Sequence, residues 1–146
     1  MSARTRVTMT PEESDGLLAS ARKMQLATIN ADHTPHLVTM FYVLREGRIT
    51  FWTYRASQKA RNLERDPRLT CLVETGEAYF ELRGVQVSGR AEPIEDVAGV
   101  GRLIAGQLMG VPAEGLDTYV EHAAPKRVAY AVIPTRTASW DHAKLL

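Results

Sequence analysis

The sequence lacks several features that would point to particular classes of protein. A single cysteine, Cys71, excludes an internal disulfide and any zinc site built from several cysteines. No apolar run approaches the roughly 20 residues that a membrane-spanning helix needs. Residues 1–9 lack the apolar core of a signal peptide. We therefore expect a soluble, cytoplasmic protein without a membrane partner.

The charges nearly cancel, because 18 Lys and Arg residues stand against 17 Asp and Glu and give a net charge of +1. Proteins that bind nucleic acid usually carry a strong basic excess, so the balance argues against such a partner. The fractions of hydrophobic residues (45%) and charged residues (24%) are those of an ordinary globular protein. A chain of 146 residues is expected to form one domain.

Familiar catalytic and metal-binding motifs are missing as well. The four histidines show no metal-ligand spacing, and there is no cluster of Cys and His. The glycines between residues 99 and 106 do not follow a strand or match a dinucleotide-binding fingerprint. Neither a serine-centred elbow nor a pair of carboxylates indicates hydrolysis. We expect no metal site.

The pattern of the chain predicts a β-rich domain. Thr10-Pro11-Glu12-Glu13 combines an N-cap, a proline in the first turn and a capping-box glutamate, and predicts a helix that ends near residues 22–23. Residues 1–9 are polar and basic and are expected to be a flexible tail. Strands are predicted at 24–30, 36–44, 49–54, 69–74, 78–93 and 126–139. Helices are predicted at 57–65, 95–109 and 112–123.

Two of these strands have irregular features. The run 78–93 is either one long strand or a bent pair, and the last strand is expected to be interrupted at Pro134. Residues 140–146 are expected to form a tail. Five or six strands joined mostly by hairpins predict a small antiparallel barrel with helical additions, in a single domain that spans residues 1–146.

The stretch 50–63 changes from strand-like to helix-like residues within a few positions. Ser57 is a good N-cap, so the backbone N–H groups of the first turn and the positive end of the helix dipole face the space above the strand end. Lys59 adds an ammonium in the same turn, and together these groups predict a phosphate site. The ring of Trp52 and the hydroxyl of Thr53 precede the turn, where they would meet a ring attached to that phosphate.

Each of these residues also has a plainer interpretation. A lone lysine on a helix is usually solvated, and Ser57 caps the helix in either case. Tryptophans such as Trp52 and Trp140 are more often core or interface residues than ring contacts. The segment 55–68 carries five basic residues against two acidic ones. This excess indicates either a solvated helix face or a groove for an acidic cofactor tail.

Two motifs resemble a known family. Ser57-Gln58-Lys59-Ala60, preceded by Phe51-Trp52-Thr53 and followed by Asp66-Pro67-Arg68, is similar to the central motif of the pyridoxamine-phosphate-oxidase-like family. In that family an aromatic-Tyr-Thr stretch precedes Ser-Arg-Lys-Ala and Asn-Pro-Arg. Residues 83–92 resemble its Arg-x-Val-x-Val-x-Gly-x-Ala-Glu strand. The resemblance covers residues 10–92 and implies an FMN-binding split β-barrel, a homodimer, and a flavin in the groove between the subunits.

The resemblance also implies where the cofactor would lie. The first turn of the helix, Ser57-Gln58-Lys59-Ala60, would hold the phosphate, and the backbone of Trp52-Thr53 would flank the ring. The backbone of Thr39-Met40-Phe41 would lie beside the ring edge, although Met40 and Phe41 are core residues by default. Trp140 is a candidate for a lid over the cofactor or a dimer contact. No side chain stands out as an obligatory acid or base, so no catalytic residue is assigned.

Several positions depart from the oxidases of that family. Those enzymes hold FMN with an Arg and a Lys on the second strand and with the Arg of Ser-Arg-Lys, where this chain has His36, Phe41 and Gln58. Gly84 replaces a flavin-contacting Gln. A charge-assisted hydrogen bond contributes ~1.5–3 kcal/mol, so the three replacements are expected to weaken FMN binding by several kcal/mol. The substrate-binding C-terminal extension of the oxidases is also missing, so oxidation of pyridoxamine phosphate is not expected.

Two further motifs are similar to the actinobacterial branch that uses the deazaflavin coenzyme F420. They are Lys59-Ala60-Arg61-Asn62-Leu63 and the ending Thr137-Ala138-Ser139-Trp140-Asp141-His142. This resemblance implies an oxidoreductase that transfers hydride from reduced F420 to an unsaturated small molecule, namely a linear tetrapyrrole, a quinone or an enone. The alternatives are an FMN-dependent reductase or oxidase of the same fold, and a carrier that binds flavin or deazaflavin without turnover.

Overall fold

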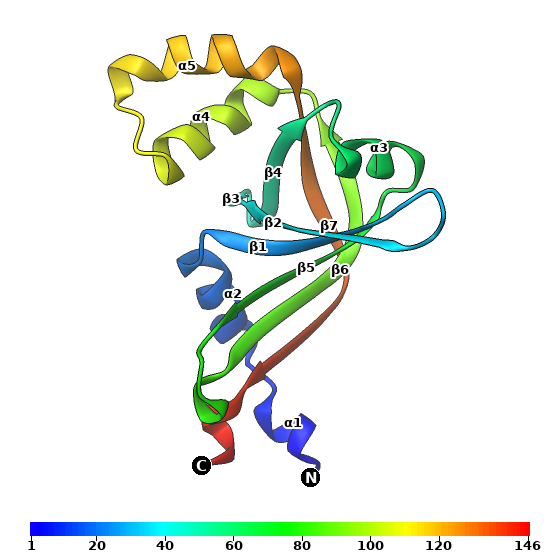
Figure 1. The fold of residues 1–146 in the computed structure, drawn as a ribbon. Coiled ribbons are helices and arrows are strands. Elements are labelled where there is room, and N and C mark those ends of the chain that lie inside the picture. Colours follow the sequence, from blue (N-terminus) through cyan, green and yellow to red (C-terminus); the bar gives the residue numbers. More distant parts are fainter.

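The computed structural model describes residues 1–146, and its strands form one antiparallel sheet that curls into a half-barrel (Figure 1). The sheet has the strand order β2-β1-β5-β6-β7-β4-β3. Its strands are β1 (Lys23–Ile29), β2 (Pro35–Phe41), β3 (Val43–Arg45), β4 (Arg48–Tyr54), β5 (Arg68–Thr75), β6 (Arg83–Ile94) and β7 (Arg127–Asp141). The architecture is thus mainly β, as the sequence predicts, with seven strands in place of five or six.

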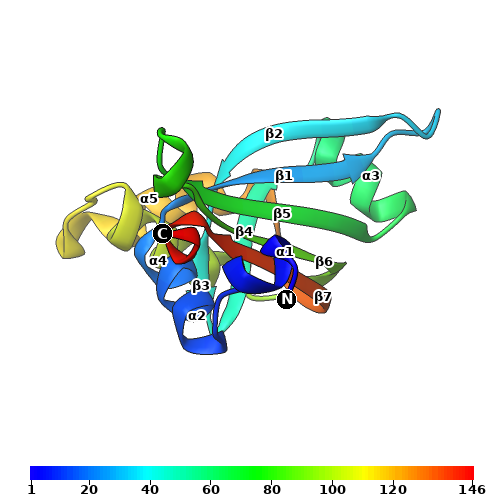
Figure 2. The same ribbon diagram turned by 90° about the horizontal axis from the view of Figure 1, so that it is seen from below.

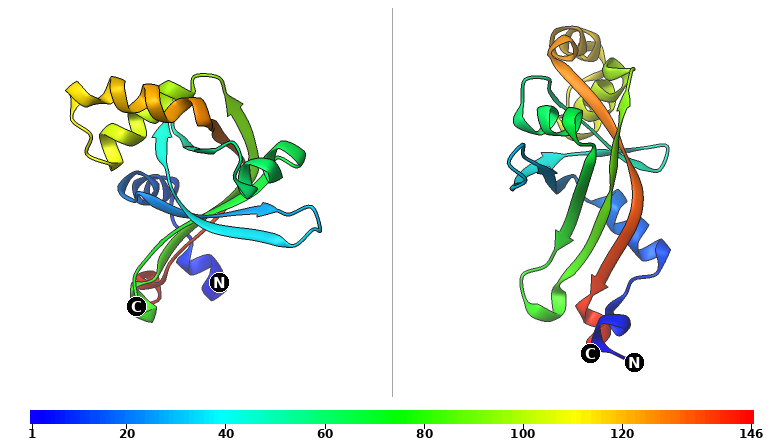
Figure 3. Two further views of the ribbon diagram at one scale, coloured as in Figure 1. Left: turned by 45° about the horizontal axis from the view of Figure 1, so that its top comes forward. Right: turned by 90° about the vertical axis from the view of Figure 1, so that its right-hand side faces the viewer.

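Helices and short 3₁₀ turns are placed around this sheet. The helices are α1 (Ala3–Val7), α2 (Pro11–Ser20), α3 (Gln58–Arg65), α4 (Val97–Leu108) and α5 (Leu116–Ala123). The turns are η1 (Tyr79–Glu81), η2 (Ala113–Gly115), η3 (Ala124–Lys126) and η4 (His142–Leu145). Figures 1 and 3 show α4 and α5 at one end of the molecule and both chain termini at the other.

The first residues are not the flexible tail that their polar composition predicts. Ser2 caps α1, and both Val7 and Met9 are buried. The backbone N–H of Met9 donates to Ser139 Oγ at 3.0 Å. The two apolar side chains and this long-range hydrogen bond hold the segment against the end of β7, which the local sequence of residues 1–9 does not reveal.

The predicted strand 36–44 is divided at Tyr42. The Tyr42 N–H donates to the carbonyl of Arg22, and its hydroxyl donates to the carbonyl of Leu18. These bonds turn the fully buried Tyr42 into the core and end the pairing of β2 with β1. The residues after Tyr42 form β3, which pairs with β4 instead. The β3–β4 connection is the pair Glu46-Gly47, both with positive φ (56° and 76°), as in the type I′ turns that suit hairpins.

The last strand continues through Pro134 instead of stopping there. A register shift between Ser88 and Gly89 on β6 accommodates the proline, which has no N–H to donate. Gly89 is required at this point, because a Cβ there would lie 2.0 Å from the carbonyl oxygen of Ile133. Consequently Trp140 belongs to β7 and not to a terminal tail. At the other end of β6, residues 79–81 form η1, so the strand begins later than predicted.

Two separate cores lie on different sides of β4. Phe51 is fully buried in the larger core, which fills the concave side of the sheet under α2. Its neighbour Trp52 points the other way, into a smaller core with Val100 and Ile104 of α4. Figure 2 shows that α4 and α5 form a pair at the opposite side of the sheet from α3. Successive side chains of β4 point to opposite faces, so this one strand contributes residues to both cores.

The register shift leads to a first prediction on stability. We expect Gly89→Ala to destabilise the protein by about 1–3 kcal/mol, because the added methyl meets rigid backbone. Gly16→Ala, in α2, is the matched control: a Cβ there meets nothing within 4 Å, so the change is expected to stabilise by up to ~1 kcal/mol. Urea unfolding measures both. If the two changes had equal effects, the close contact between Gly89 and the backbone of β7 would be contradicted.

An ion pair between the two ends of the chain leads to a prediction on pH. The Lys144 ammonium, at 2.7 Å, and the Thr10 N–H lower the pKa of Glu13 from 4.5 to about 2. Because folding lowers the pKa of Glu13, the ion pair stabilises the folded state at pH values above the pKa of Glu13 in the unfolded chain. This stabilisation is lost as the pH falls toward 2. We expect Glu13→Gln to lower the melting temperature at neutral pH, with the difference from wild type shrinking as the solution is acidified. Glu12→Gln, in the same turn, should show no such pH-dependent difference.

Candidate cofactor-binding site

The junction of β4 and α3 has the geometry that the sequence predicts. Ser57 has extended backbone (φ −69°, ψ 156°), and its hydroxyl accepts from the Ala60 N–H at 3.2 Å. The same hydroxyl lies 3.3 Å from that of the buried Thr53. The cap thus uses the Ser57 side chain and the Ala60 N–H. The N–H groups of Gln58 and Lys59 remain available to a ligand, since the first turn of a helix offers them no acceptor.

Lys59 differs from the other basic residues of its segment. Its ammonium has no hydrogen bond and no ion pair, and its partial burial lowers its pKa below the ordinary value. The guanidinium groups nearby are each bonded within the protein, as follows: Arg55 to the Pro125 carbonyl, Arg61 to that of Ala56, Arg65 to that of Ile29, and Arg68 to the Asp66 carboxylate. A partly desolvated cation without a counter-charge favours the binding of an anion.

A buried asparagine within the motif 59–63, for which the sequence predicted no role of its own, fixes α3 in place. The Asn62 amide is fully buried and donates to Thr28 Oγ1 and to Asn30 Oδ1, both at 3.0 Å. Its oxygen accepts from Gln58 Nε2 at 2.8 Å and from Arg65. The Gln58 amide nitrogen is therefore engaged inside the protein. No local sequence signal identifies this role, because the β1-side partners of Asn62 are 34 and 32 residues away in the chain.

His36 lies beside this network. It is the cross-strand neighbour of Thr28, and its Nδ1 is buried without a hydrogen-bond partner. Together with Gln58 and residues 30–32 it lines an open hollow between the β1–β2 turn and α3. Buried polar atoms without a partner are rare in folded proteins, and a bound group at such a place can supply the missing partner.

The three residues expected beside the ring edge lie on β2, an edge strand of the sheet. Thr39 and Phe41 point outward, and Thr39 Oγ1 donates to Gln25 Oε1 at 3.0 Å. Met40 points inward and packs on the larger core. Phe41 is 51% exposed, which is unusual for a large aromatic side chain. From His36 to Phe41 the strand extends about 17 Å, so α3 and the exposed Phe41 mark its two ends.

The indole of Trp52 does not face the α3 junction. It packs on α4, where a Cβ at Gly101 would lie 2.4 Å from its Cζ3. The Arg127 guanidinium carbon lies 4.8 Å from the centre of the ring. The pleat of β4 sends this side chain to the second core, so one chain does not direct the Trp52 ring at the junction. The backbone of residues 52–53 still lies at the junction.

Trp140 lies at the far end of the sheet. It pairs with Gly84, and its indole covers that residue so closely that a Cβ on Gly84 would lie 2.3 Å from Trp140 Cζ2. Gly84 in turn pairs with Glu74, near the end of β5, whereas α3 precedes the start of β5 at Arg68. These ends of β5 are about 20 Å apart. One chain therefore does not bring Trp140 to Ser57 and Lys59, although it unites Ser57, Gln58, Lys59, Ala60 and Thr53.

The family of the chain follows from this fold and from comparison with known proteins. Residues 10–141 match the model of the family described as pyridoxamine 5′-phosphate oxidase. The chain belongs to this family. The match includes the β4–α3 junction and both long strands, and it agrees with the split-barrel fold seen here. A comparison with curated proteins finds no match.

Three solved structures illustrate the range of similar proteins. The conserved hypothetical protein Rv2991 from Mycobacterium tuberculosis is 37% identical, with a TM-score of 0.90, over 99% of this chain and 92% of that chain. An F420 reductase is 24% identical (TM-score 0.67) over 88% of this chain and 98% of its own. The heme storage protein HutZ from Vibrio cholerae is 16% identical (TM-score 0.69) over 88% and 94%. The last two identities show a common fold and nothing more.

Other kinds of site are not found in this chain. No group of three or more His, Cys, Asp or Glu residues is arranged to hold a metal ion. No helix has both the length and the apolar character that crossing a membrane requires. Burial raises the pKa of the Cys71 thiol to about 12, so this cysteine is a core residue without a reactive thiolate. The junction of β4 and α3 is therefore the best candidate for the functional site.

The buried amide network leads to a third prediction. We expect Asn62→Ala to lower the free energy of unfolding by about 1–3 kcal/mol, because it removes four hydrogen bonds and leaves buried polar partners unsatisfied. Glu64→Ala, on the exposed side of the same helix, is expected to change stability by less than about 0.5 kcal/mol. Chemical denaturation of both variants provides the measurement. An Asn62 variant as stable as the Glu64 variant would exclude the network as the anchor of α3.

Proposed function

We propose that this protein is an oxidoreductase that binds reduced coenzyme F420 and transfers hydride to an unsaturated organic acceptor. The observation that carries the proposal is the unpaired, half-buried Lys59 in the first turn of a capped helix. The free N–H groups of Gln58 and Lys59 point the same way as the helix dipole. Such a set of donors fits a phosphate group. When bound, the deazaflavin supplies the hydride, and the protein supplies orientation and electrostatics.

The charge of the site supports the deazaflavin over FMN. Gln58 and His36 stand where the family's oxidases have arginines, and the Gln58 amide nitrogen is already bonded to Asn62. The other arginines of α3 hold the protein together, so Lys59 is the main cation left for a phosphate. Each missing charge-assisted bond lowers affinity by ~1.5–3 kcal/mol. The fold shared with an F420 reductase agrees with this choice.

The position of the ring follows from the direction of β2. With the phosphate at α3, a cofactor that runs along this strand places its ring near the backbone of residues 39–41. The outward, exposed side of Phe41 offers an apolar wall for a flat acceptor such as a linear tetrapyrrole, a quinone or an enone. We assign no acid or base residue: the hydride leaves the reduced deazaflavin, which becomes oxidised, and the proton that completes reduction of the acceptor comes from solvent.

We further propose that two copies of the chain form the site together. Leu37 and Phe41 on the edge strand are 66% and 51% exposed, and Tyr54 at the end of β4 is 54% exposed. Helix α2 packs on the concave side of β6, and the outward residues of β1 and β5, such as Ala27 and Leu72, are only half-buried in one chain. A second copy on this face covers these apolar side chains and brings its own Trp140 within reach of the first copy's cofactor.

Two alternatives have specific support. An FMN-dependent reductase or oxidase is supported by membership of the pyridoxamine 5′-phosphate oxidase family. A carrier that binds flavin or deazaflavin without turnover is the second alternative. The common fold with a heme storage protein shows that this architecture also occurs in a protein that stores its ligand.

A side-by-side titration tests the proposal. We expect reduced F420 to bind more tightly than FMN, and Lys59→Ala to weaken F420 binding by ~1.5–3 kcal/mol with the fold intact. Arg61→Ala, which removes a charge from the same helix but whose guanidinium is bonded to Ala56, should change affinity by less than about 1 kcal/mol. Equal losses in the two variants would remove Lys59 from the site.

The same experiment separates the alternatives. Protein that binds FMN and ignores F420 would contradict the leading proposal and favour the FMN enzyme. Tight binding of reduced F420 without its oxidation, across a panel of tetrapyrroles, quinones and enones, would favour the carrier.

A further inference from the structure

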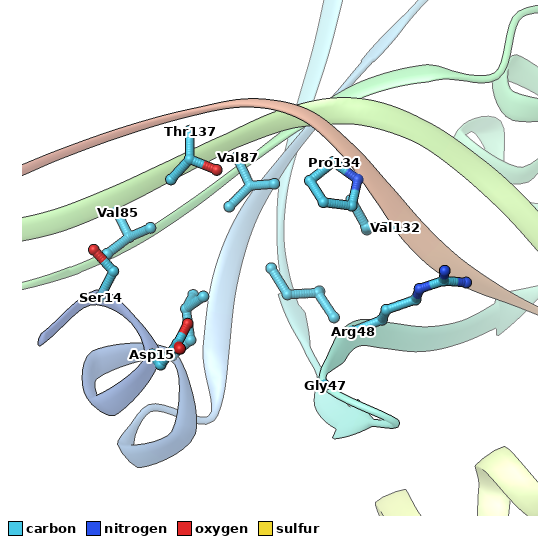
Figure 4. A pocket seen from close by; sticks show the side chains of 11 residues that line it. Ser14, Asp15, Gly47, Arg48, Val85, Val87, Val132, Pro134 and Thr137 are labelled. Atoms are coloured by element: carbon cyan, nitrogen blue, oxygen red, sulfur yellow. The ribbon is translucent and has the colours of Figure 1, made fainter. Parts of the chain in front are cut away.

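A second, smaller pocket lies on the concave side of the sheet, away from α3. It is enclosed by α2, by the β3–β4 turn and by the inner face of β6 and β7 (Figure 4). Its volume is about 170 Å³. Val85, Val87 and Val132 form its floor, and all three are buried members of the larger core. The floor of this pocket is therefore apolar and rigid.

Polar side chains stand at the rim of this pocket without protein partners. Ser14, on α2, is only 9% exposed, yet its hydroxyl makes no hydrogen bond within the chain. A helical serine can donate its hydroxyl to the carbonyl one turn earlier, but the Thr10 carbonyl accepts only the backbone N–H of Ser14. The Thr137 hydroxyl, across from it on β7, is also unbonded. The Ser14 hydroxyl oxygen is open to the pocket, since His36 Nδ1 is the one buried polar side-chain atom without a partner. A ligand hydroxyl can therefore bond to Ser14 in place of water.

The two charged groups at the rim restrict the ligand further. Asp15 follows Ser14 on α2 and takes part in no ion pair. Figure 4 shows the guanidinium of Arg48 on the far side of the pocket, directed away from α2. The negative charge therefore lies beside the free hydroxyl, which favours a neutral hydrogen-bonding group there over a carboxylate.

We propose that this pocket binds a small, neutral, monocyclic molecule that carries one hydroxyl group, of the phenol class. An apolar cavity of roughly 150 Å³ accepts a benzene ring, so the present volume accommodates a single ring with a small substituent. The ring packs on the valine floor, and its hydroxyl bonds to Ser14. A flavin-sized ring system does not fit. The site is distinct from the β4–α3 junction and does not rest on the proposed redox function.

Titrations with phenol, toluene and benzoate, followed by ligand-observed NMR and calorimetry, test the proposal. We expect saturable binding of one phenol per chain, with toluene and benzoate at least about fivefold weaker, since each lacks a neutral hydroxyl for Ser14. Ser14→Ala should abolish the preference for phenol over toluene. Phenol bound at this site should not be displaced by FMN or F420.

A matched pair on β7 locates the site. Thr137 lines the pocket and Thr135 does not, although both are exposed on the same strand. We expect Thr137→Phe to reduce phenol affinity at least tenfold by filling the opening, and Thr135→Phe to change it less than twofold. Circular dichroism checks that the variants are folded. If a phenylalanine variant is not folded, the loss of the phenol preference in Ser14→Ala tests the site instead. No saturable binding, equal effects of the two phenylalanines, or displacement by FMN or F420 would overturn the proposal.

Discussion

The position of α3 depends on one buried side chain, the amide of Asn62. It satisfies Thr28 and Asn30 on the β1 side and accepts from Gln58 and Arg65 on its own helix. Because every hydrogen bond of this amide stays within the protein, the helix is held over the end of β1 in a single orientation. That orientation sets the direction of the first turn, and with it the free N–H groups and the ammonium of Lys59. The candidate site is thus as rigid as this network.

The distribution of side chains between two cores decides which groups remain for a ligand. The pleat of β4 assigns Phe51 to the barrel and Trp52 to α4, so the conspicuous tryptophan is a packing residue. On β6, Gly84 makes room for the indole of Trp140. In the family's oxidases a glutamine that contacts flavin stands at the position of Gly84. The chain therefore has the family's fold but a different surface, with a large aromatic ring at the end of the sheet.

We propose F420 in place of FMN because of the electrostatics of the site, and not because of its backbone. The arginines around α3 are bonded to carbonyl groups and to Asp66, and they stabilise the local structure. Lys59 alone keeps an unpaired charge next to the capped turn. The buried, unpartnered nitrogen of His36 lies close by. With Lys59 as the one free cation, the site offers the phosphate of FMN fewer charge-assisted bonds than the family's oxidases do, and this supports the proposed F420.

The sequence by itself determined the local elements of the fold. The capping box at Thr10 and the N-cap at Ser57 formed as expected, since both depend on residues within one helical turn. The family motifs indicated the barrel. Only the tertiary structure decided that Tyr42 divides a strand, that residues 1–9 pack on β7, and that Trp52 faces a second core. It also revealed that Asn62 anchors α3. Each of these outcomes depends on contacts between residues far apart in the chain, and a local pattern of hydrophobicity does not contain that information.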